Sequence, residues 1–306
     1  MLRRNVLIFH AGALGDFVVT WPLALALGRL HPQSRIVYVA QGGKGKLAEK
    51  ALRVESADVD GGAFHHLYGD PAKLPEPSRK LVDGAHSIYS FVSSPSDNWT
   101  AAVATINPEA KVTHLSPRPP DDDPFPGHVS EWLEQQLAPS PAVRTAYQQI
   151  MKAVATRGVG YKRSPEGTVV VHPGSGSPKK NWTHFVPLVR RIVKSRRHVS
   201  VLIGEAEKEL LPAEELAHFK AVAEVVEPKD FVELLTHLGV ADAVVCNDSG
   251  PAHLAGIIGT PTFAIYGPAS NAKRWRPMGP HVHVKETADL GHLGAEEVWE
   301  WVKGTL

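Results

Sequence analysis

The two halves of the chain begin with the same order of sequence features. Val6–Phe9 is a short apolar run followed by a glycine-bearing loop and a helical pattern, and Thr168–His172 is followed by a Gly/Ser loop and the amphipathic segment His184–Ser195. A strand, a glycine loop and a helix in this order are typical of a parallel α/β unit. The repeat therefore predicts two Rossmann-like domains, residues 1–157 and residues 158–306, with parallel sheets that face each other across a cleft.

Apolar, β-branched runs alternate with helical patterns along both halves, which indicates an α/β fold. We expect further strands at Arg35–Ala40, Ile88–Val92, Lys111–Leu115, Val199–Ile203, Ala223–Val226, Ala243–Cys246 and Thr262–Tyr266. We expect further helices near residues 17–30, 127–137, 143–156 and 295–303. The last of these could pack on either domain.

Charge and cysteine content narrow the class of protein. The net charge is only +1, which argues against a general nucleic-acid-binding protein. The single cysteine, Cys246, excludes an internal disulfide and favours a reducing, cytoplasmic compartment. The apolar run near the N-terminus is too short for a signal peptide, and no segment approaches bilayer length. We therefore expect a soluble, cytoplasmic protein with at most peripheral contact with the inner membrane.

A polar turn in the second half offers an anion site. In AVVCNDSGPAHLAGIIGTPTFAIYGP, the turn from Asn247 to Gly250 lies between a strand and a short helix. Ser249 is suited to cap that helix, and Pro251 fits its first turn. The helix N-terminus and nearby His253 suit a phosphate or diphosphate. From these residues alone, an ordinary buried crossover with a capped helix is an equal alternative.

The Gly/Ser loop of the same half points to the same ligand. Gly174–Ser177 supplies backbone N–H and hydroxyl donors, and Lys179 and Lys180 add positive charge. The G-x-x-x-x-G-K-[ST] pattern is absent, which disfavours a kinase or ATPase of that type. The alternative is a solvated turn with two surface lysines.

Glu205, Glu207 and Glu209 follow a predicted strand, where acidic groups commonly bind ribose hydroxyls. They would equally favour the N-terminus of the following helix through its dipole, and the sequence leaves both interpretations open.

The loop of the first half departs from the dinucleotide fingerprint. Gly12 and Gly15 do not give G-x-G-x-x-G, which disfavours a nicotinamide dehydrogenase. Asp16 could accept a proton from an incoming hydroxyl. It could instead cap a helix that begins at Phe17. The sixteen histidines show no H-E-x-x-H spacing, so no metal site is predicted.

Three segments, taken together and in order, resemble the heptosyltransferases, the family 9 glycosyltransferases of lipopolysaccharide core assembly. They are AGALGDFVVTWPLALALGRLHP, VVVHPGSGSPKKNWTHFVPLV and LLTHLGVADAVVCNDSGPAHLAGIIGTPTFAIYGP. The first is similar to the family's G-D-V-x-x-T-x-P-L segment, with Phe17 after the aspartate. The second is similar to H-P-G-x-G-x-x-K-x-W, and the third to N-D-[ST]-G-x-x-H-x-A.

The resemblance implies a GT-B architecture, with the donor held mainly by the second domain and the acceptor by the first. It implies an inverting, single-displacement transfer without a bound metal or other cofactor. Asp16 becomes the general base, and Lys180 contacts the donor diphosphate. The rest of the implied diphosphate site is Ser175, Asp248, Ser249, Gly250 and His253.

The acceptor side departs from the family pattern. GAHSIYSFVSSPSDNWT lacks the expected basic cluster, so Lys44 and Lys46, with Gly15, are the candidate acceptor residues. The expected donor is an ADP-linked heptose or another nucleotide sugar, and the expected acceptor is a cell-envelope glycan or glycolipid. The alternatives are a non-catalytic nucleotide-sugar-binding protein and a GT-B nucleotide-sugar hydrolase or epimerase.

Overall fold

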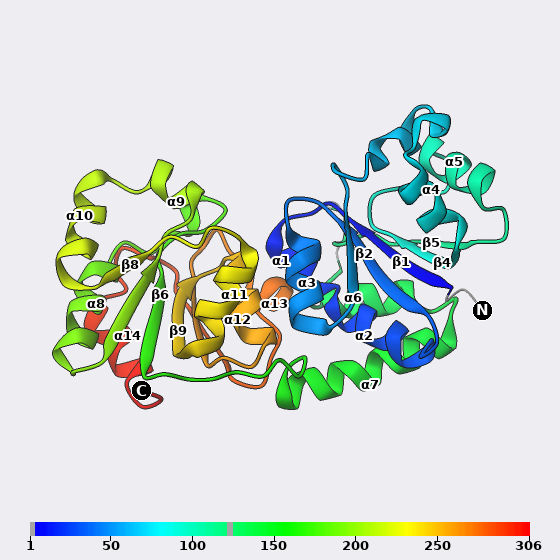
Figure 1. Ribbon diagram of the computed structural model, residues 1–306. Helices are drawn as coiled ribbons and strands as arrows, with labels where there is room; N and C mark the ends of the chain where they lie inside the picture. Colours follow the sequence, from blue (N-terminus) through cyan, green and yellow to red (C-terminus); the bar gives the residue numbers. More distant parts are fainter. Residues whose placement is uncertain (1–3, 121–124) are drawn as a thin grey trace. The chain divides into compact units, whose positions relative to one another are not determined.

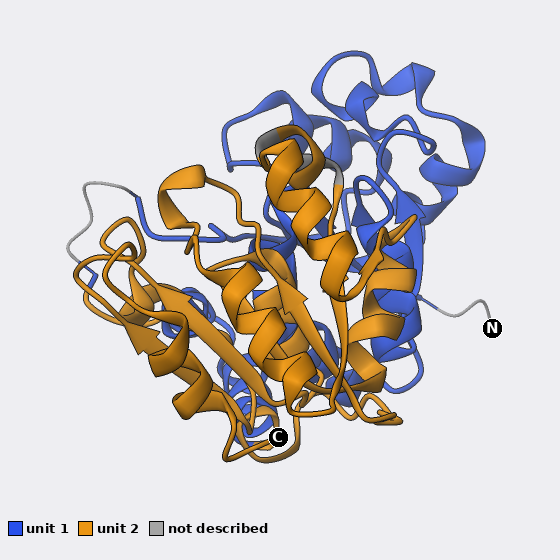
Figure 2. Ribbon diagram, turned by 90° about the vertical axis from the view of Figure 1, so that its left-hand side faces the viewer, with its two compact units in different colours: residues 1–125, 129–152 blue, residues 126–128, 153–306 orange. Residues whose placement is uncertain are grey.

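The computed structural model describes residues 4–120 and 125–306, without the side chains of residues 205, 206 and 210. The chain divides into two compact units. Unit 1 comprises residues 1–125 and 129–152, and unit 2 comprises residues 126–128 and 153–306 (Figure 2). The chain passes from unit 1 to unit 2 within a long helix, α7 (Pro141–Arg157), after Lys152. The predicted domain boundary after residue 157 stays a prediction.

Unit 1 is built on a parallel sheet of five strands in the order β3-β2-β1-β4-β5 (Figure 1). The strands are β1 (Asn5–His10), β2 (Arg35–Ala40), β3 (Glu55–Asp58), β4 (Ala85–Ser90) and β5 (Lys111–His114). The helices are α1 (Leu14–Val19), α2 (Trp21–Leu30), α3 (Lys44–Leu52), α4 (Glu76–Asp83), α5 (Asn98–Ile106), α6 (Val129–Gln136) and α7, with short 3₁₀ turns η1 (Phe64–Tyr68) and η2 (Pro71–Lys73).

Both faces of the unit 1 sheet are covered. β1 is buried along its whole length, as expected for the central strand of a parallel sheet. Leu7 and Phe9 face a core formed with η1, α4 and α5. Tyr38 points to the opposite face, where its ring packs on Phe17 of α1 and its hydroxyl contacts Thr20. The sheet is therefore doubly wound.

Unit 2 contains a parallel sheet of six strands in the order β11-β10-β9-β6-β7-β8. The strands are β6 (Thr168–His172), β7 (His198–Leu202), β8 (Glu224–Val226), β9 (Ala241–Asn247), β10 (Thr262–Tyr266) and β11 (Val282–Glu286). The helices are α8 (Phe185–Lys194), α9 (Glu205–Leu210), α10 (Ala213–Val222), α11 (Phe231–Val240), α12 (Gly250–Ile257), α13 (Ala272–Trp275) and α14 (Ala295–Val302), with the 3₁₀ turn η3 (Pro178–Lys180).

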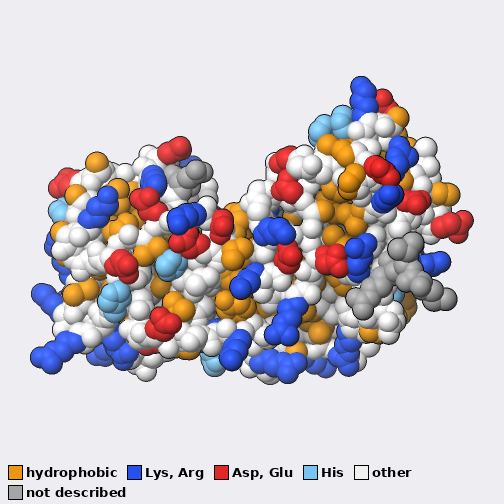
Figure 3. All heavy atoms as spheres, viewed as in Figure 1, with side chains coloured by type: hydrophobic (Ala, Val, Ile, Leu, Met, Phe, Trp, Pro, Cys, Tyr) orange, Lys and Arg blue, Asp and Glu red, His pale blue; other side chains and the backbone are white. Residues whose placement is uncertain are grey.

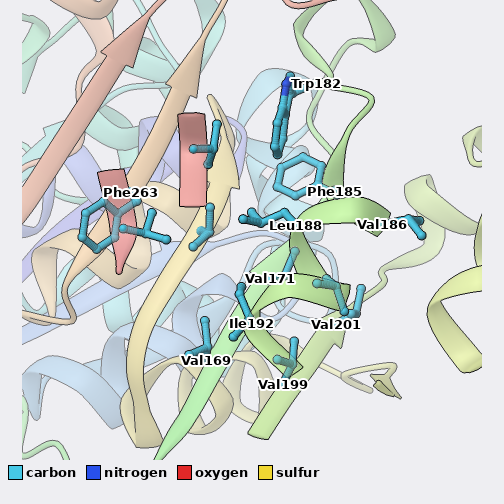
Figure 4. Packing of buried hydrophobic residues seen from close by; sticks show 14 of the residues in the cluster. Val169, Val171, Trp182, Phe185, Val186, Leu188, Ile192, Val199, Val201 and Phe263 are labelled. Carbon is cyan, nitrogen blue, oxygen red and sulfur yellow. The ribbon is translucent and has the colours of Figure 1, made fainter. Parts of the chain in front are cut away.

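The main core of unit 2 lies between the sheet and α8. Phe185, Leu188 and Ile192 share one face of this helix because they are three and seven residues apart, and all three are buried. They pack over alternate valines of β6 and β7, as Figure 4 shows. Burial of each large apolar side chain contributes about 1.5–3 kcal/mol. The opposite face of the sheet is covered by α11 and α12.

The two sheets share a topological feature. Numbered within its own unit, each sheet has the order 3-2-1-4-5, continued by a sixth strand in unit 2. This is the doubly wound order in which the chain reverses direction between strands 1 and 4. The switch points are therefore between β1 and β4 in unit 1, and between β6 and β9 in unit 2. Ligands of such sheets bind at the carboxyl ends of the strands at this point.

The predicted α/β class with two parallel sheets is confirmed, and Arg35–Ala40, Thr168–His172 and Thr262–Tyr266 are strands with the predicted bounds. Two edge strands, β3 and β11, were not predicted because their sequences, ESAD and VHVKE, are not continuous apolar runs.

The single helix predicted over residues 17–30 is wrong, because α1 ends at Val19 and α2 begins at Trp21. Pro22 lies in the first turn of α2 and has no N–H with which to continue the hydrogen bonding of α1. The last helix, α14, packs against α8 and buries Val298 and Val302 in the core of unit 2. Within the described part of the chain, no helix has the length and apolar character needed to cross a bilayer.

Candidate functional site

The switch point of unit 2 brings two predicted loops together. His172 at the end of β6 is in register with Cys246 near the end of β9. The Gly/Ser loop after β6 and the Asp248–Ser249 turn after β9 therefore leave the same edge of the sheet from neighbouring strands. The sequence placed these loops more than 70 residues apart, and only the parallel pairing of β6 with β9 joins them.

An ion pair connects the two loops. Lys180 Nζ lies 2.7 Å from Asp248 Oδ2. The Asp248 side chain is 6% exposed and that of Lys180 is 30% exposed, so the carboxylate is the buried partner. A buried carboxylate next to an ammonium fixes the position of the cation, because separating the pair would leave an uncompensated charge. One side of Lys180 still faces solvent.

Asn247 fixes the backbone around this ion pair. Its side chain is fully buried, donates to the carbonyl of Pro173 over 2.6 Å and accepts the N–H of Trp182 over 3.0 Å. One amide thus connects β9 to both ends of the Gly/Ser loop. Ser175 is buried in that loop, and its hydroxyl contacts the carbonyl of Ser177 and the side chain of Asn181.

The helix that follows the turn, α12, presents its N-terminus at the same edge. Ser249 occupies the N-cap position and Pro251 lies in the first turn, as predicted. The predicted capping hydrogen bond is wrong, because the Ser249 side chain makes no bond to the helix. Its buried Oγ has no hydrogen-bond partner among the described residues. The hydroxyl and the first N–H groups of α12, beginning with that of Gly250, are arranged to bind an anion.

His253 lies in the first turn of α12 and is buried. Burial lowers its pKa to about 4, and His128 and Lys180 add to this effect, while the Asp248 carboxylate opposes it. The imidazole is therefore neutral near pH 7. Burial and the Asp248 carboxylate also raise the pKa of Tyr266, whose hydroxyl donates to the carbonyl of Trp275.

A second buried pair lies beside the Gly/Ser loop. His172 Nε2 is 3.5 Å from Glu207 Oε1, and Glu207 Oε2 accepts the N–H of Gly204 over 2.8 Å. Burial by itself would raise the pKa of Glu207, but the bonds to His172 and Gly204 outweigh it and lower the pKa. Glu207 is thus engaged with the protein, whereas Glu209 is exposed, and the side chain of Glu205 lies outside the described part of the structure.

The predicted residues of the first half lie at the switch point of unit 1. Asp16 and Gly15 are in the first turn of α1, whose N-cap residue is Ala13, so the alternative in which Asp16 caps a helix starting at Phe17 is wrong. His10 ends β1, is buried, and accepts the N–H of Gly12 at Nδ1 over 3.2 Å. No role was predicted for His10, Asn247 or His172, although Asn247 and His172 lie within the segments that resemble the family, because their contacts are made with residues far away in the sequence.

The two candidate acceptor lysines differ in their surroundings. Lys44, the first residue of α3, is half-buried, and this burial lowers its pKa. Lys46 is exposed and lies 2.7 Å from Glu49. The ammonium of Lys44 is near His10 and contributes to lowering the histidine's pKa, and the acceptor role of both lysines stays a prediction.

Within residues 4–120 and 125–306, no cluster of three or more His, Cys, Asp or Glu side chains has metal-binding geometry. Acidic and basic side chains are both spread over the face of the molecule in Figure 3. The absence of a cofactor and of a nucleic-acid partner stays a prediction.

Comparison with known proteins identifies similar molecules. The family model for glycosyltransferase family 9 (heptosyltransferase) matches residues 133–293. The solved structure of E. coli ADP-heptose lps heptosyltransferase II is similar at 18% identity and a TM-score of 0.69, over 98% of each chain. E. coli heptosyltransferase WaaC with ADP is similar at 17% identity and a TM-score of 0.68, over 99% of this chain and 100% of that chain.

A family 9 glycosyltransferase from Veillonella parvula DSM 2008 is similar at 16% identity and a TM-score of 0.70, over 100% of this chain and 98% of that chain. No curated protein sequence matches the chain. At these identities the solved structures establish the fold, and the family model establishes the family.

Proposed function

The chain belongs to glycosyltransferase family 9, the heptosyltransferase family, and we propose that it transfers heptose or a similar sugar from an ADP-linked donor to a cell-envelope glycan such as lipopolysaccharide core. Transfer inverts the anomeric carbon in one displacement and uses no metal ion. The ADP seen with the similar E. coli protein WaaC supports the choice of nucleotide. The expected location is the cytoplasm, with at most peripheral contact with the inner face of the membrane.

One observation carries the donor site: the Lys180–Asp248 ion pair in front of the α12 N-terminus. A diphosphate at the switch point meets the exposed side of Lys180, the unpaired Ser249 hydroxyl and the N–H groups of α12. Asp248 is itself negative, so it acts on the diphosphate indirectly, by holding Lys180 in place. Ser175, Gly250 and His253 complete the surroundings of the diphosphate.

The reaction requires a general base and a stabilised leaving group. A hydroxyl oxygen of the acceptor sugar attacks the anomeric carbon of the donor while the bond from that carbon to the diphosphate oxygen breaks. Asp16, in the first turn of α1, takes the hydroxyl proton, since a positioned carboxylate is suited to general-base catalysis. Lys180 and the α12 N-terminus stabilise the negative charge that develops on the departing ADP.

The donor site is tested by calorimetric titration with ADP, UDP and GDP. The wild-type protein is compared with Lys180→Ala, and with Lys179→Ala as a matched control, because Lys179 is the exposed neighbour. We expect ADP to bind in preference to UDP and GDP, with the affinity about tenfold or more weaker in Lys180→Ala and unchanged in Lys179→Ala.

Each other outcome changes the proposal. Preferential binding of UDP or GDP would retain the glycosyltransferase but change the donor class. If the two lysine variants weakened the affinity for ADP equally, Lys180 would have no specific contact with the diphosphate. If none of the three nucleotides bound, the proposed donor site would be wrong.

A further inference from the structure

His10 ends β1 at the switch point of unit 1, and the proposed transfer gives it no role. Its side chain is 0% exposed, yet its Nε2 atom has no hydrogen-bond partner among the described residues. Buried polar side-chain atoms in native proteins are nearly always paired, so an unpaired one requires an explanation. A substrate that supplies the missing partner is one.

The state of the imidazole follows from its contacts. Its Nδ1 atom accepts the N–H of Gly12 over 3.2 Å, so a neutral ring carries its proton on Nε2. Burial, assisted by the positive charge of Lys44, lowers the pKa of His10 to about 3. The ring is therefore neutral near pH 7, and Nε2–H is an uncharged donor.

The ring is also fixed in place next to the proposed base. Its centroid lies 5.4 Å from those of Phe17 and Phe91, which limits its rotation. A Cβ built on Gly12 would lie only 2.8 Å from His10 Cε1, 3.4 Å from His10 Nε2 and 3.3 Å from Asp16 Cβ, so a side chain at this position would collide with the imidazole. The absence of a side chain on Gly12 therefore lets the imidazole and Asp16 lie close to the same residue. A donor and a proton acceptor that are both next to Gly12 can act on one hydroxyl group.

We propose that His10 is an acceptor-binding residue, whose Nε2–H donates a hydrogen bond to an uncharged hydroxyl oxygen of the acceptor sugar and orients that sugar toward Asp16. The inference rests on the proposed function. A neutral, buried imidazole cannot compensate the charge of a phosphate, but it matches a hydroxyl. The hydrogen bond from His10 is therefore suited to a sugar hydroxyl rather than to a phosphate.

Two variants separate this role from a structural one. His10→Asn keeps an acceptor atom near the Nδ1 position for the Gly12 N–H but loses the Nε2–H donor. His10→Gln places an N–H near the Nε2 position but loses the Nδ1 acceptor. If His10 only holds the Gly12 loop, His10→Asn should retain function and His10→Gln should not. The proposal requires the reverse.

The measurement is the rate of ADP release from ADP-heptose, with the heptose-free core oligosaccharide of lipopolysaccharide as acceptor at varied concentration. We expect His10→Asn to raise the KM for the acceptor about tenfold, as the loss of one hydrogen bond predicts. His10→Gln should recover most of that loss. The affinity for ADP, measured by calorimetry, should be the same in all three proteins. Equal impairment of the two variants, or a wild-type KM in His10→Asn, would overturn the proposal.

A second measurement distinguishes failure of this inference from failure of the proposed function. If the wild-type protein binds no ADP or transfers nothing, the proposed function fails in its donor or its acceptor. The side-chain ¹⁵N resonances of His10 then decide the inference, with the same oligosaccharide as probe. An Nε2 signal that shifts on addition of the oligosaccharide supports it, and an Nε2 signal that stays while other signals of the protein shift refutes it.

Discussion

The switch points of the two units have the same topology but opposite chemistry. In unit 2, the loops that follow β6 and β9 bring together an ammonium, a buried carboxylate and the N-terminus of α12. In unit 1, the carboxyl end of β1 lies beside the Asp16 carboxylate and the neutral imidazole of His10, with the half-buried ammonium of Lys44 nearby. One edge is suited to an anion and the other to a hydroxyl. The sheet order places both candidate sites at the carboxyl ends of the strands, while the side chains at those ends give each site its own chemistry.

Removal of the Asp16 carboxylate should produce the largest effect. Asp16→Asn should lower the rate of transfer from ADP-heptose by a factor of about 10²–10⁴, because the amide cannot accept the hydroxyl proton. Asp83→Asn is the matched control, since Asp83 is exposed and precedes β4, at the opposite edge of the same sheet. The affinity for ADP should be unchanged in both variants. A wild-type rate of transfer in Asp16→Asn would show that Asp16 is not the general base.

The two switch points share one feature, a buried neutral histidine, and this makes stability depend on pH. The pKa of His10 is lowered to about 3 and that of His253 to about 4, so below their ordinary value of 6.5 the unfolded chain binds more protons than the folded one. Stability is therefore full above pH 6.5 and falls as the pH drops toward these values.

Urea unfolding of His253→Gln between about pH 5 and pH 6 tests this dependence. The free energy of unfolding should change less steeply with pH than in the wild-type protein, by about 1.4 kcal/mol per pH unit, the contribution of one proton. His10→Gln should reduce the slope in the same way through unit 1. An unchanged slope in either variant would mean that its histidine is protonated in the folded state.

The variant Gly174→Ala tests how tightly the residues beside the Gly/Ser loop of unit 2 are packed. A Cβ at this position would lie only 1.9 Å from Glu207 Oε1, so Gly174→Ala must displace a buried carboxylate that holds the Gly204 N–H. We expect a loss of about 1–3 kcal/mol in the free energy of unfolding, with weaker ADP binding. Gly176→Ala is the control, because its Cβ meets nothing within 4 Å. Equal stability of the two variants would show that Glu207 rearranges freely.

Substitution of Lys46 should have the smallest effect on stability and on the KM for the acceptor. Its ion pair with Glu49 is exposed to solvent on both sides, so Lys46→Ala should change the free energy of unfolding by less than about 1 kcal/mol. The KM for the acceptor should also stay close to the wild-type value, while Lys44→Ala, at the half-buried neighbour of His10, should change it more. A larger effect of Lys46 than of Lys44 on that KM would place the acceptor along the outer surface of α3.

The sequence predicted the central strands better than the edges of the sheets. β2, β6 and β10 were found with their bounds because buried strands of a parallel sheet are continuous apolar runs. β3 is half-exposed and reads ESAD, and only its pairing with β2 makes it a strand. For the same reason, His10 was missed: its burial depends on Phe91, which follows a strand some 80 residues away.

The sequence by itself determined the class of the fold, the family and the two glycine loops, since each of these is carried by local composition and spacing. The tertiary structure decided which polar groups meet. It paired Lys180 with Asp248, joined Asn247 to the Gly/Ser loop, and left Ser249 without its expected capping bond. It also buried His10 in a neutral form. These facts depend on parallel strands bringing distant loops to one edge, because the distance between loops and the burial of a side chain are not local properties of the chain.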